Sequence, residues 1–472
     1  MSNSIVMKFG GTSMGSAERI RVSAGIAAAE RANRPVAIVV SAMSKVTDLL
    51  LETLRQAENG NRAAVDANVA GLRERHETTA RELLTSPDAV VAGIGVLVGE
   101  FERIAQGMLL LGDRPPRSVD EAVAIGERLT ALIIAAYLTE TGTPAEAVNA
   151  AQVVVTDSVF GNATPIMSAT RVRAAEVILP LLAAGKIAVM TGFNGATADG
   201  KPTTLGRGGS DFSASILASA VDAEELWIWT DVDGIMTADP RLVKDARVLD
   251  EVTYAEAAEL AYNGAKVLHP RTLAPLVEKK IPVWSKNSFN LAAPGTHIVP
   301  ALRDDEPRGA RAVTSMANVA LVSVEPASAA ISGTRVMARA LDALDIVNAE
   351  VLTLSSSSYR QSFCFLVRKD ELPGVLKGLE EALALEMEHG YVKPFEIDEN
   401  VGLLAVVGEG MRGVPGLAGR VFTAVSKEGI SIIAIAQGSS ELTINLVVSR
   451  DGLERAVKAI HAECGLGRSA ES

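Results

Sequence analysis

The chain has 472 residues, of which 48% are hydrophobic and 22% charged, a balance that excludes a disordered polyelectrolyte and fits about three domains of roughly 150 residues. Its 45 lysines and arginines face 57 aspartates and glutamates, which gives a net charge of −12, and aromatic residues make up only 4%. An acidic surface repels phosphate backbones and few rings remain to stack on bases, so the composition argues against a nucleic-acid partner.

Cysteine content and apolar run length indicate the compartment. Cys364 and Cys464 are far apart and form no CxxC pair, so neither a thiolate zinc site nor a disulfide framework is expected. The segment Met1-Ser2-Asn3-Ser4 lacks the basic character of a signal peptide, and the longest apolar runs, at 131–138 and 430–436, are shorter than the 18 or so residues that span a bilayer. The sequence therefore predicts a cytoplasmic protein without a membrane partner.

From residue 1 to about 300, short β-branched runs alternate with longer helical stretches. This alternation predicts an α/β fold with a parallel or mixed sheet between helices. The region 57–112 contains no convincing strand and predicts a helical insertion that caps one edge of the sheet. The expected strands are 5–8, 36–40, 152–156, 187–191, 225–229 and 281–284, and the expected helices are 18–32, 119–139, 169–184, 213–220 and 254–262.

A second part of the chain follows a charged, proline-containing boundary at 303–311. Two similar patterns occur there with an offset of roughly 80 residues, and each predicts a βαββ unit that a further helix and strand would complete as βαββαβ. The sequence thus predicts a pair of regulatory modules. In order, the first module has a strand at 319–324, a helix at 336–344, a strand from 346, a serine-rich turn at 355–358 and a strand at 363–367. The second module has a strand at 401–407, a helix at 417–426, a strand at 430–436, a turn at 438–440 and a strand at 442–448.

The segment Lys8-Phe9-Gly10-Gly11-Thr12-Ser13 lies where the first strand ends and a helix is about to begin. Adjacent glycines let backbone N–H groups approach an anion, and a lysine there can bridge phosphate oxygens. It is not a Walker A loop, because Ser16 stands where a lysine is required. A glycine-rich turn without a ligand remains the alternative for this segment taken alone.

A second glycine-rich segment, Thr203 to Asp211, also precedes a helix and contains Gly206, Gly208 and Gly209 with Arg207. Two anion-binding loops in one domain predict two anionic ligands or one ligand held at both ends. Asp211 either caps the helix or holds Lys8 charged and oriented.

A third segment runs from Trp229 to Arg241. It leaves a strand at Thr230-Asp231 and enters a turn rich in Asp, Gly and Pro, as expected where a nucleotide meets the carboxyl edge of a sheet. Asp233 and Asp239 could equally be turn formers. The segment Gly264 to Pro270 adds Lys266 after a helix and means little alone.

Together these motifs resemble those of the aspartokinases. The resemblance rests on Lys8 to Ser13, Ser41-Ala42-Met43-Ser44, Gly192-Phe193, Thr204 to Asp211, Trp229 to Gly234 and Gly264 to Pro270. The tandem repeat resembles paired ACT domains, especially those of threonine-sensitive aspartokinase–homoserine dehydrogenases, through 408–412 and 434–441, although the chain stops at Ser472 without a dehydrogenase. The resemblance implies a three-layer α/β/α amino acid kinase domain at 1–302, with its insertion at 57–112, and ferredoxin-like βαββαβ ACT domains at 312–395 and 396–468.

The implied reaction transfers the γ-phosphoryl group of MgATP to the side-chain carboxylate of L-aspartate. The product, 4-phospho-L-aspartate, begins the lysine, threonine and methionine branch. Mg²⁺ is expected with ATP, without identified protein ligands. By matched motif, the phosphoryl group would be neutralised by Lys8 and organised by Asp211, and N–H groups would come from Gly10, Gly11, Gly208 and Gly209. Aspartate would be bound by Ser41, Thr47, Glu127, Phe193, Arg207 and Ser210. The nucleotide would be bound by Thr230, Asp231, Met236, Arg241 and Lys266.

Several assignments have alternatives. Without the motif match, Glu127 would be interpreted as a solvated surface charge, and Met236 departs from the tyrosine that relatives often carry. His269, which precedes Pro270, is interpreted as a structural hydrogen bonder, because an ionised carboxylate needs no general base. A kinase for another small amino acid, such as glutamate or acetylglutamate, and an inactive amino-acid sensor on the same scaffold remain alternative functions.

The two repeats differ where an effector is expected. Gln437 precedes Gly438-Ser439-Ser440 in the second repeat, whereas the serine run of the first repeat has no preceding glutamine. We therefore expect weak or absent threonine inhibition, or another effector such as lysine, at an ACT interface between subunits of a homodimer or higher homo-oligomer. Asn348 is a second candidate effector residue. Alternatively, the ACT pair serves only as a dimerisation surface.

Overall fold

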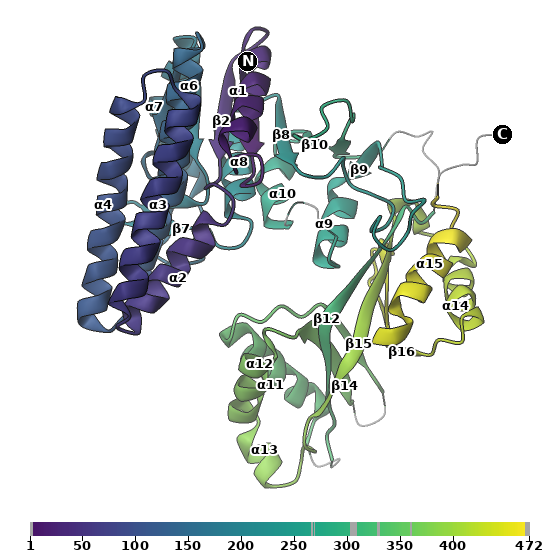
Figure 1. The fold of residues 1–472 in the computed structure, drawn as a ribbon. Coiled ribbons are helices and arrows are strands. Elements are labelled where there is room, and N and C mark those ends of the chain that lie inside the picture. The colour runs from purple at the N-terminus through teal and green to yellow at the C-terminus, as the bar shows by residue number, and fades with distance from the viewer. Residues whose placement is uncertain are drawn as a thin grey trace, which may run out of the picture. The chain divides into compact units, whose positions relative to one another are not determined.

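The computed structural model describes residues 3–265, 268, 270–302, 309–327, 331–358 and 361–467. The chain divides into two compact units, each described by itself below (Figure 1). Unit 1 comprises Met1–Ile235, Asp250–Tyr254 and Leu268–Leu302, and unit 2 comprises Met236–Leu249, Ala255–Val267 and Arg303–Ser472.

Unit 1 is built on an eight-stranded sheet. Five consecutive strands in its middle, from β5 to β10, run parallel, and the shorter β3 joins them in the same direction at one edge. β1, β2 and β5 are buried along their whole length, which explains their continuous apolar sequences. The strand order is β3 (Ala145–Val148), β5 (Ile187–Thr191), β2 (Val36–Val40), β1 (Ile5–Phe9), β8 (Glu225–Thr230), β10 (Val283–Asn287), β11 (Thr296–Val299) and β9 (Glu251–Thr253).

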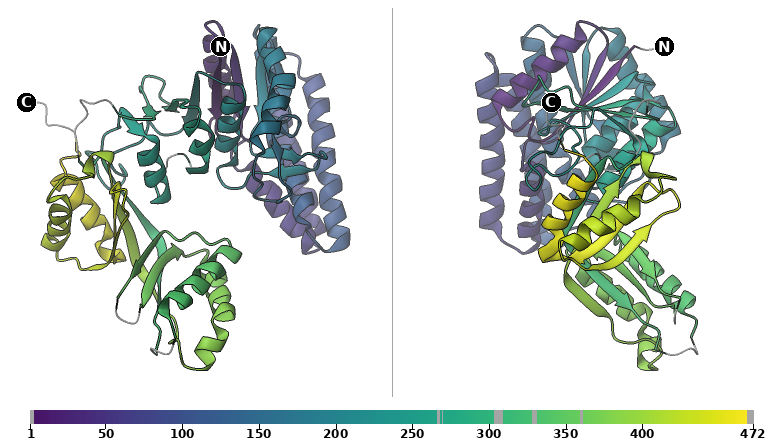
Figure 2. Two further views of the ribbon diagram at one scale, coloured as in Figure 1. Left: turned by 180° about the vertical axis from the view of Figure 1, so that it is seen from behind. Right: turned by 90° about the vertical axis from the view of Figure 1, so that its right-hand side faces the viewer.

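Helices cover both faces of this sheet, as Figures 1 and 2 show, so the predicted three-layer α/β/α fold is confirmed. On one face lie α1 (Ala17–Arg31) and α6 (Ile125–Glu140), and on the other α7 (Met167–Ala183), α8 (Gly209–Ala220) and α10 (Pro270–Val277). The stretch Pro116–Glu140 is long and apolar enough to cross a membrane by length and composition, but most of it is buried inside unit 1, as in a core helix.

The helical insertion forms a further layer of helices. It consists of α3 (Arg62–Leu83) and α4 (Asp88–Leu111), preceded by α2 (Val46–Glu58). These helices pack on one another and on α1 and α6. The expected cap on the sheet edge is therefore wrong: Val90, Ile94, Val98, Phe101 and Ala105 make α4 apolar along one side, and that side is buried in the core shared with α6.

Several boundaries in unit 1 differ from the prediction. The helix expected at 119–139 is broken at Ala124 into α5 (Pro116–Val123) and α6, and the strand expected at 152–156 is only β4 (Val155–Thr156), because Gln152 lies in a 3₁₀ turn. β3 was not predicted, since its sequence, Ala-Glu-Ala-Val, is a weak strand signal. A second, three-stranded sheet joins β4 to β6 (Asn194–Thr197) and β7 (Pro202–Thr204).

Unit 2 contains a six-stranded antiparallel sheet centred on two long strands, β12 (Ala312–Val324) and β15 (Glu396–Val407). The strand expected from Ile346 begins only at Thr353, because Ile346 ends α11, and Ser355 and Ser356 lie in β13 rather than in a turn. The strand order is β13 (Thr353–Ser356), β14 (Phe363–Arg368), β12, β15, β17 (Thr443–Ser449) and β16 (Ile432–Gln437). The helices are α9 (Tyr254–Tyr262, mostly in this unit), α11 (Gly333–Ile346), α12 (Leu372–Ala382), α13 (Ala384–Glu388), α14 (Leu417–Lys427) and α15 (Leu453–Glu463).

The two βαββαβ modules are interleaved on the long strands. Residues 319–324 of β12 pair with β14, and 321–323 pair with 396–398 of β15, so the first module closes with the start of β15. Residues 312–316 pair with 403–407 and supply the fourth strand of the second module. The final strand expected after α15 is therefore replaced by a segment that precedes the first module, because both long strands extend through the two modules.

Each module has its own helix-covered core. α11 and α12 pack on Val322 and Phe365, and α14 and α15 pack on Val313 and Leu446 (Figure 1). The segment 236–249 also belongs to the second of these cores through Ala238, Val243 and Ala246. The predicted boundary at 302 placed this segment in the kinase domain, whereas its apolar side chains pack in unit 2.

Candidate active site

The candidate residues of unit 1 follow the carboxyl ends of four neighbouring parallel strands. β5, β2, β1 and β8 lead into Gly192, Ser41, Gly10 and Asp231, respectively. Three backbone hydrogen bonds join these four successive ends: Gly192 N–H to Val40 O, Ser41 N–H to Phe9 O, and Gly10 N–H to Trp229 O. The carboxyl edge of a parallel sheet is where α/β proteins bind ligands.

Lys8 and Asp211 form an ion pair at this edge. Lys8 lies on β1 and is only 9% exposed, and its Nζ is 2.6 Å from Oδ1 of Asp211 in the first turn of α8. The N-cap of α8 is Gly208, in a left-handed conformation, so Asp211 does not cap the helix. The carboxylate instead holds the lysine ammonium in place next to the glycine loops.

The glycines act partly by leaving space. A Cβ on Gly10 would lie 3.2 Å from Nζ of Lys8, so the glycine makes room for the ammonium. The N–H groups of Gly10 and Gly209 already donate to Trp229 O and Gly206 O, so the expectation of free donors at these two positions is wrong. For the N–H groups of Gly11 and Gly208, the described residues provide no hydrogen-bond acceptor.

Glu127 is buried in the first turn of α6 rather than solvated, being 2% exposed. Its Oε1 accepts a hydrogen bond from Ala42 N at 3.2 Å, and within the described ranges its Oε2 has no partner. Burial raises the pKa of Glu127 to about 8. An unpaired buried carboxylate of this kind would be stabilised by a ligand cation.

Phe193 has the left-handed conformation, with φ of 70°, which is strained for a bulky residue. Its N–H donates to Ser213 Oγ at 2.9 Å, and its ring packs against Gly209, where a Cβ would lie 2.6 Å from Cδ2. A Cβ on Gly192 would similarly be 2.8 Å from Ser210 Cβ. The 192–193 turn therefore packs closely against the start of α8.

The remaining predicted aspartate-binding side chains are more accessible. Arg207 is exposed and has no ion-pair partner in the described part of the chain, and Ser41 is half-buried beside Ala42. Thr47 lies in the first turn of α2, two residues after Lys45, a non-glycine residue with φ of 64°. These three side chains are free to meet a ligand.

The predicted nucleotide residues are divided between the two units. In unit 1, Thr230 donates to Asp231 at 3.3 Å. In unit 2, Met236 packs against the second module's core and Arg241 is paired with Asp239, Nη2 to Oδ2 at 2.5 Å. Lys266 and His269 lie outside the described residues. That these residues line one nucleotide site stays a prediction.

Asp120 is not among the predicted site residues, yet its carboxylate accepts three hydrogen bonds, one from Gly161 and two from Thr204 in the second glycine-rich segment. A signal was present, since Asp120 is an acidic residue on the buried side of α5, next to Val123 in the following turn. Buried carboxylates in such positions require partners.

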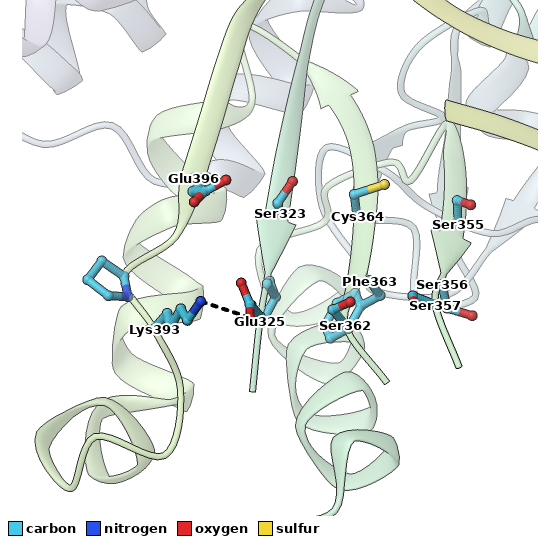
Figure 3. A pocket seen from close by; sticks show the side chains of 12 residues that line it. Ser323, Glu325, Ser355, Ser356, Ser357, Ser362, Phe363, Cys364, Lys393 and Glu396 are labelled. Carbon is cyan, nitrogen blue, oxygen red and sulfur yellow. Dashed lines mark ion pairs between the residues drawn. The ribbon is translucent and has the colours of Figure 1, made fainter. Parts of the chain in front are cut away.

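Unit 2 contains a polar cavity of about 320 Å³ at one end of the first module (Figure 3). Lys393 and Glu325 form an ion pair of 2.8 Å at its wall. Gln437, at the end of β16, and Asn348, after α11, are exposed and do not line it. The lining is rich in hydroxyl groups and includes Ser323, Ser355, Ser356, Ser357, Ser362, Cys364 and Glu396.

Comparison with known proteins identifies the family of this chain. The amino acid kinase family model matches residues 3–287, and an ACT domain model matches 404–464. The chain is 34% identical to the aspartokinase of Chlamydia trachomatis, with 95% of each chain covered. It is 35% identical to bifunctional aspartokinase/homoserine dehydrogenase 1 of Arabidopsis thaliana over 98% of this chain but 51% of that protein, so it spans about half the length of such bifunctional relatives.

Solved structures agree with these matches. Aspartokinase III of E. coli in complex with aspartate and ADP is similar at 30% identity with a TM-score of 0.83, covering 97% of this chain and 99% of that one. Its complex with lysine and aspartate gives a TM-score of 0.79 at the same identity, with 98% and 100% covered. The chain therefore belongs to the amino acid kinase family and, within it, to the aspartokinases.

Proposed function

We propose that this protein is an aspartate kinase, which transfers the γ-phosphoryl group of ATP to the side-chain carboxylate of L-aspartate and releases 4-phospho-L-aspartate. The observation that carries the proposal is the Lys8–Asp211 ion pair at the same sheet edge as the buried, unpaired carboxylate of Glu127. A similar enzyme, aspartokinase III of E. coli, has been solved with aspartate and ADP bound.

Phosphoryl transfer between two oxygens depends on positioning and on neutralising charge. The Lys8 ammonium, held by Asp211, stabilises the charge on the transferring group, and the free N–H groups of Gly11 and Gly208 donate to its oxygens. The attacking carboxylate of aspartate is already ionised, so no side chain has to remove a proton.

Aspartate is recognised by the two charged groups on its α-carbon, the α-ammonium and the α-carboxylate. Glu127 accepts the α-ammonium, which supplies the cation that its buried carboxylate lacks. Arg207 pairs with the α-carboxylate as a two-pronged donor. Ser41, Thr47, Phe193 and Ser210 complete the substrate-binding residues of this proposal.

Mg²⁺ is proposed to arrive with ATP. In the described residues no group of three or more His, Cys, Asp or Glu side chains forms a metal cage. This fits a cation that keeps water and phosphate oxygens as most of its ligands, with Asp231 available near the nucleotide. When bound, Mg²⁺ neutralises phosphate charge.

A coupled hydroxamate assay with aspartate, glutamate and acetylglutamate tests the proposed function. We expect turnover of aspartate alone. K8A should lower kcat by at least about tenfold, equivalent to about 1.4 kcal/mol, because it removes the charge next to the transferring group. K186A is the matched control, since among the described residues the Lys186 side chain pairs only with Glu146, in an exposed ion pair. Turnover of another substrate, or a K8A enzyme with near-normal kcat, would refute the assignment.

Regulation by an amino acid is proposed for unit 2, in a cytoplasmic homo-oligomer joined through its ACT-type modules. The serine-lined cavity offers hydroxyl groups and both charge signs, as an amino acid requires (Figure 3). Lysine is the first effector to test, because it is bound in a structure of aspartokinase III. An alternative is that the modules only join subunits.

Binding calorimetry with lysine, threonine and methionine, together with inhibition curves, tests this part of the proposal. S355A in the cavity and Q437A outside it decide which location holds the effector. We expect weak or absent threonine inhibition. Tight threonine inhibition in the low micromolar range would contradict this expectation, and no binding of any of the three would leave only the dimerisation role.

A further inference from the structure

The loop that carries Arg207 is anchored by a buried carboxylate of α5. Asp120 is 2% exposed, and its Oδ2 accepts hydrogen bonds from Thr204 N and Gly161 N, both at 2.8 Å. Its Oδ1 accepts from Thr204 Oγ1, also at 2.8 Å. Thr204 ends β7, three residues before Arg207.

The partners of Asp120 are neutral donors. Three hydrogen bonds therefore compensate the buried charge, and two of them come from backbone N–H groups, which only an acceptor can receive. Both backbone N–H groups donate to the same oxygen, Oδ2, while Oδ1 faces the Thr204 hydroxyl, which can donate or accept. The position thus requires an acceptor oxygen that receives two N–H groups, and alanine is the substitution that removes it.

The turn at 161–163 forms the other wall of this anchor. Ala163 N–H donates to Thr204 O at 2.8 Å, and a Cβ on Gly206 would lie 2.7 Å from Oδ1 of Asn162. Arg271 of α10 donates to Asn162 Oδ1 and lies within 3.5 Å of Leu205 O. The base of the Arg207 loop is therefore held on several sides, and Asp120 bonds to both β7 and this turn.

Asp120 is also close in sequence to the proposed ammonium-binding residue. Glu127 follows it by seven positions, and only Ala124 lies between α5 and α6. Glu127 in turn accepts a hydrogen bond from Ala42 N. One short helical segment thus contacts the loop proposed to bind the α-carboxylate and provides the group proposed to bind the α-ammonium.

We propose that Asp120 is a positioning residue for amino-acid recognition, which fixes the Arg207 loop relative to Glu127 so that both ends of the substrate are engaged together. This inference rests on the proposed function. Asp120 does not touch the substrate, and its effect passes through Thr204 and the loop that follows.

Steady-state kinetics of D120A test the inference, because alanine removes both acceptor oxygens whereas asparagine could keep an amide oxygen in the place of Oδ2. We expect the KM for aspartate to rise at least about tenfold while the KM for ATP stays within about twofold, because a displaced loop misplaces Arg207 but leaves Lys8 in position. E140A is the matched control: the Glu140 carboxylate also accepts from two backbone N–H groups, those of Thr85 and Ser86, but it lies at the opposite end of α6 from Glu127. It should retain the wild-type KM for aspartate.

T204V and T204S provide a milder pair in case D120A does not fold. T204V removes one donor to Asp120 and keeps the backbone bond, so its KM for aspartate should rise less than that of D120A. T204S retains the hydroxyl and should behave as wild type. Hydrogen exchange of the 204–208 amides should speed up in D120A and T204V.

The outcomes separate this inference from the proposed function. If wild-type enzyme does not phosphorylate aspartate, the proposed function fails. If it does, but D120A and T204V leave the KM for aspartate unchanged, or raise both KM values equally with a loss of stability, Asp120 is merely structural and the inference is overturned.

Discussion

At the scale of a single side chain, the proposed role of Glu127 predicts that aspartate binding depends on pH. Burial raises the pKa of Glu127 to about 8, so at neutral pH the carboxyl group must lose its proton when it accepts an ammonium. We expect the dissociation constant of aspartate to fall as pH rises from 6.5 to 8.5, by up to about tenfold per pH unit below the pKa. Calorimetry in buffers of different ionisation enthalpy measures both the affinity and the proton release.

E127Q is the matching variant, because it retains the shape without the ionisation. It should bind aspartate weakly and without this pH dependence. A pH-independent affinity of the wild-type protein over this range would show that the carboxylate does not bind the ammonium. The same burial lowers stability: a pKa raised above the ordinary value of 4.5 means that stability present below about pH 4.5 is lost progressively as pH rises to about 8. The stability gain of E127Q over wild type should therefore grow across this range and be largest above pH 8.

His76 has the opposite effect on stability. The ring is fully buried in α3, Nδ1 lies 2.7 Å from Leu72 O, and burial lowers the pKa of His76 from 6.5 to about 4. The unfolded chain takes up this proton first, so stability present above pH 6.5 is lost as pH falls toward 4, by about 3 kcal/mol. Denaturant unfolding at pH 7.5 and 4.5 should show a smaller loss for H76L.

H389L is the control for His76. His389 has the same contact with the carbonyl four residues earlier, Nδ1 to Leu385 O at 2.7 Å, but its ring is exposed. This variant should retain the acid sensitivity of the wild type. Equal sensitivity of H76L and wild type would mean that other groups dominate the acid response.

At the scale of elements, the start of α2 is strained. Lys45 precedes the helix with φ of 64° and has no side-chain capping hydrogen bond. Glycine accepts this conformation without the steric cost, so K45G should stabilise the protein by about 0.5–1 kcal/mol. Chemical denaturation measures the difference. K45A keeps the strain and removes the ammonium group; an equal gain in K45A would point to charge rather than backbone conformation.

At the scale of the whole molecule, the interleaved modules predict an effect that the chain order hides. Val313 precedes the first module but packs in the core of the second, with Leu446 and α15, whereas Val322 packs with α11 and α12. V313D buries an unpaired charge and should speed hydrogen exchange in α14, α15 and β17. V322D should do so in α11, α12 and β14. Loss of protection in the same elements for both variants would contradict two separate cores.

The sequence determined the elements with strong local signals. Strands β1, β2 and β5 are continuous apolar runs, and α9 has the bounds that its pattern predicts, because side-chain period and burial coincide there. The glycine-rich segments were also identified, since closely spaced glycines mark close approaches of the backbone. The pairing of Lys8 with Asp211 could only be posed as one of two alternatives, because it joins residues about 200 positions apart.

Only the tertiary structure decided the remainder. The burial of Glu127, the three bonds of Asp120 and the engaged N–H groups of Gly10 and Gly209 depend on partners from distant segments. β3 forms because β5 offers an edge for pairing, and residues 312–316 join the second module because β15 extends past the first. Local sequence sets the period and capping of an element, whereas the choice of its partner is a property of the whole chain packed together.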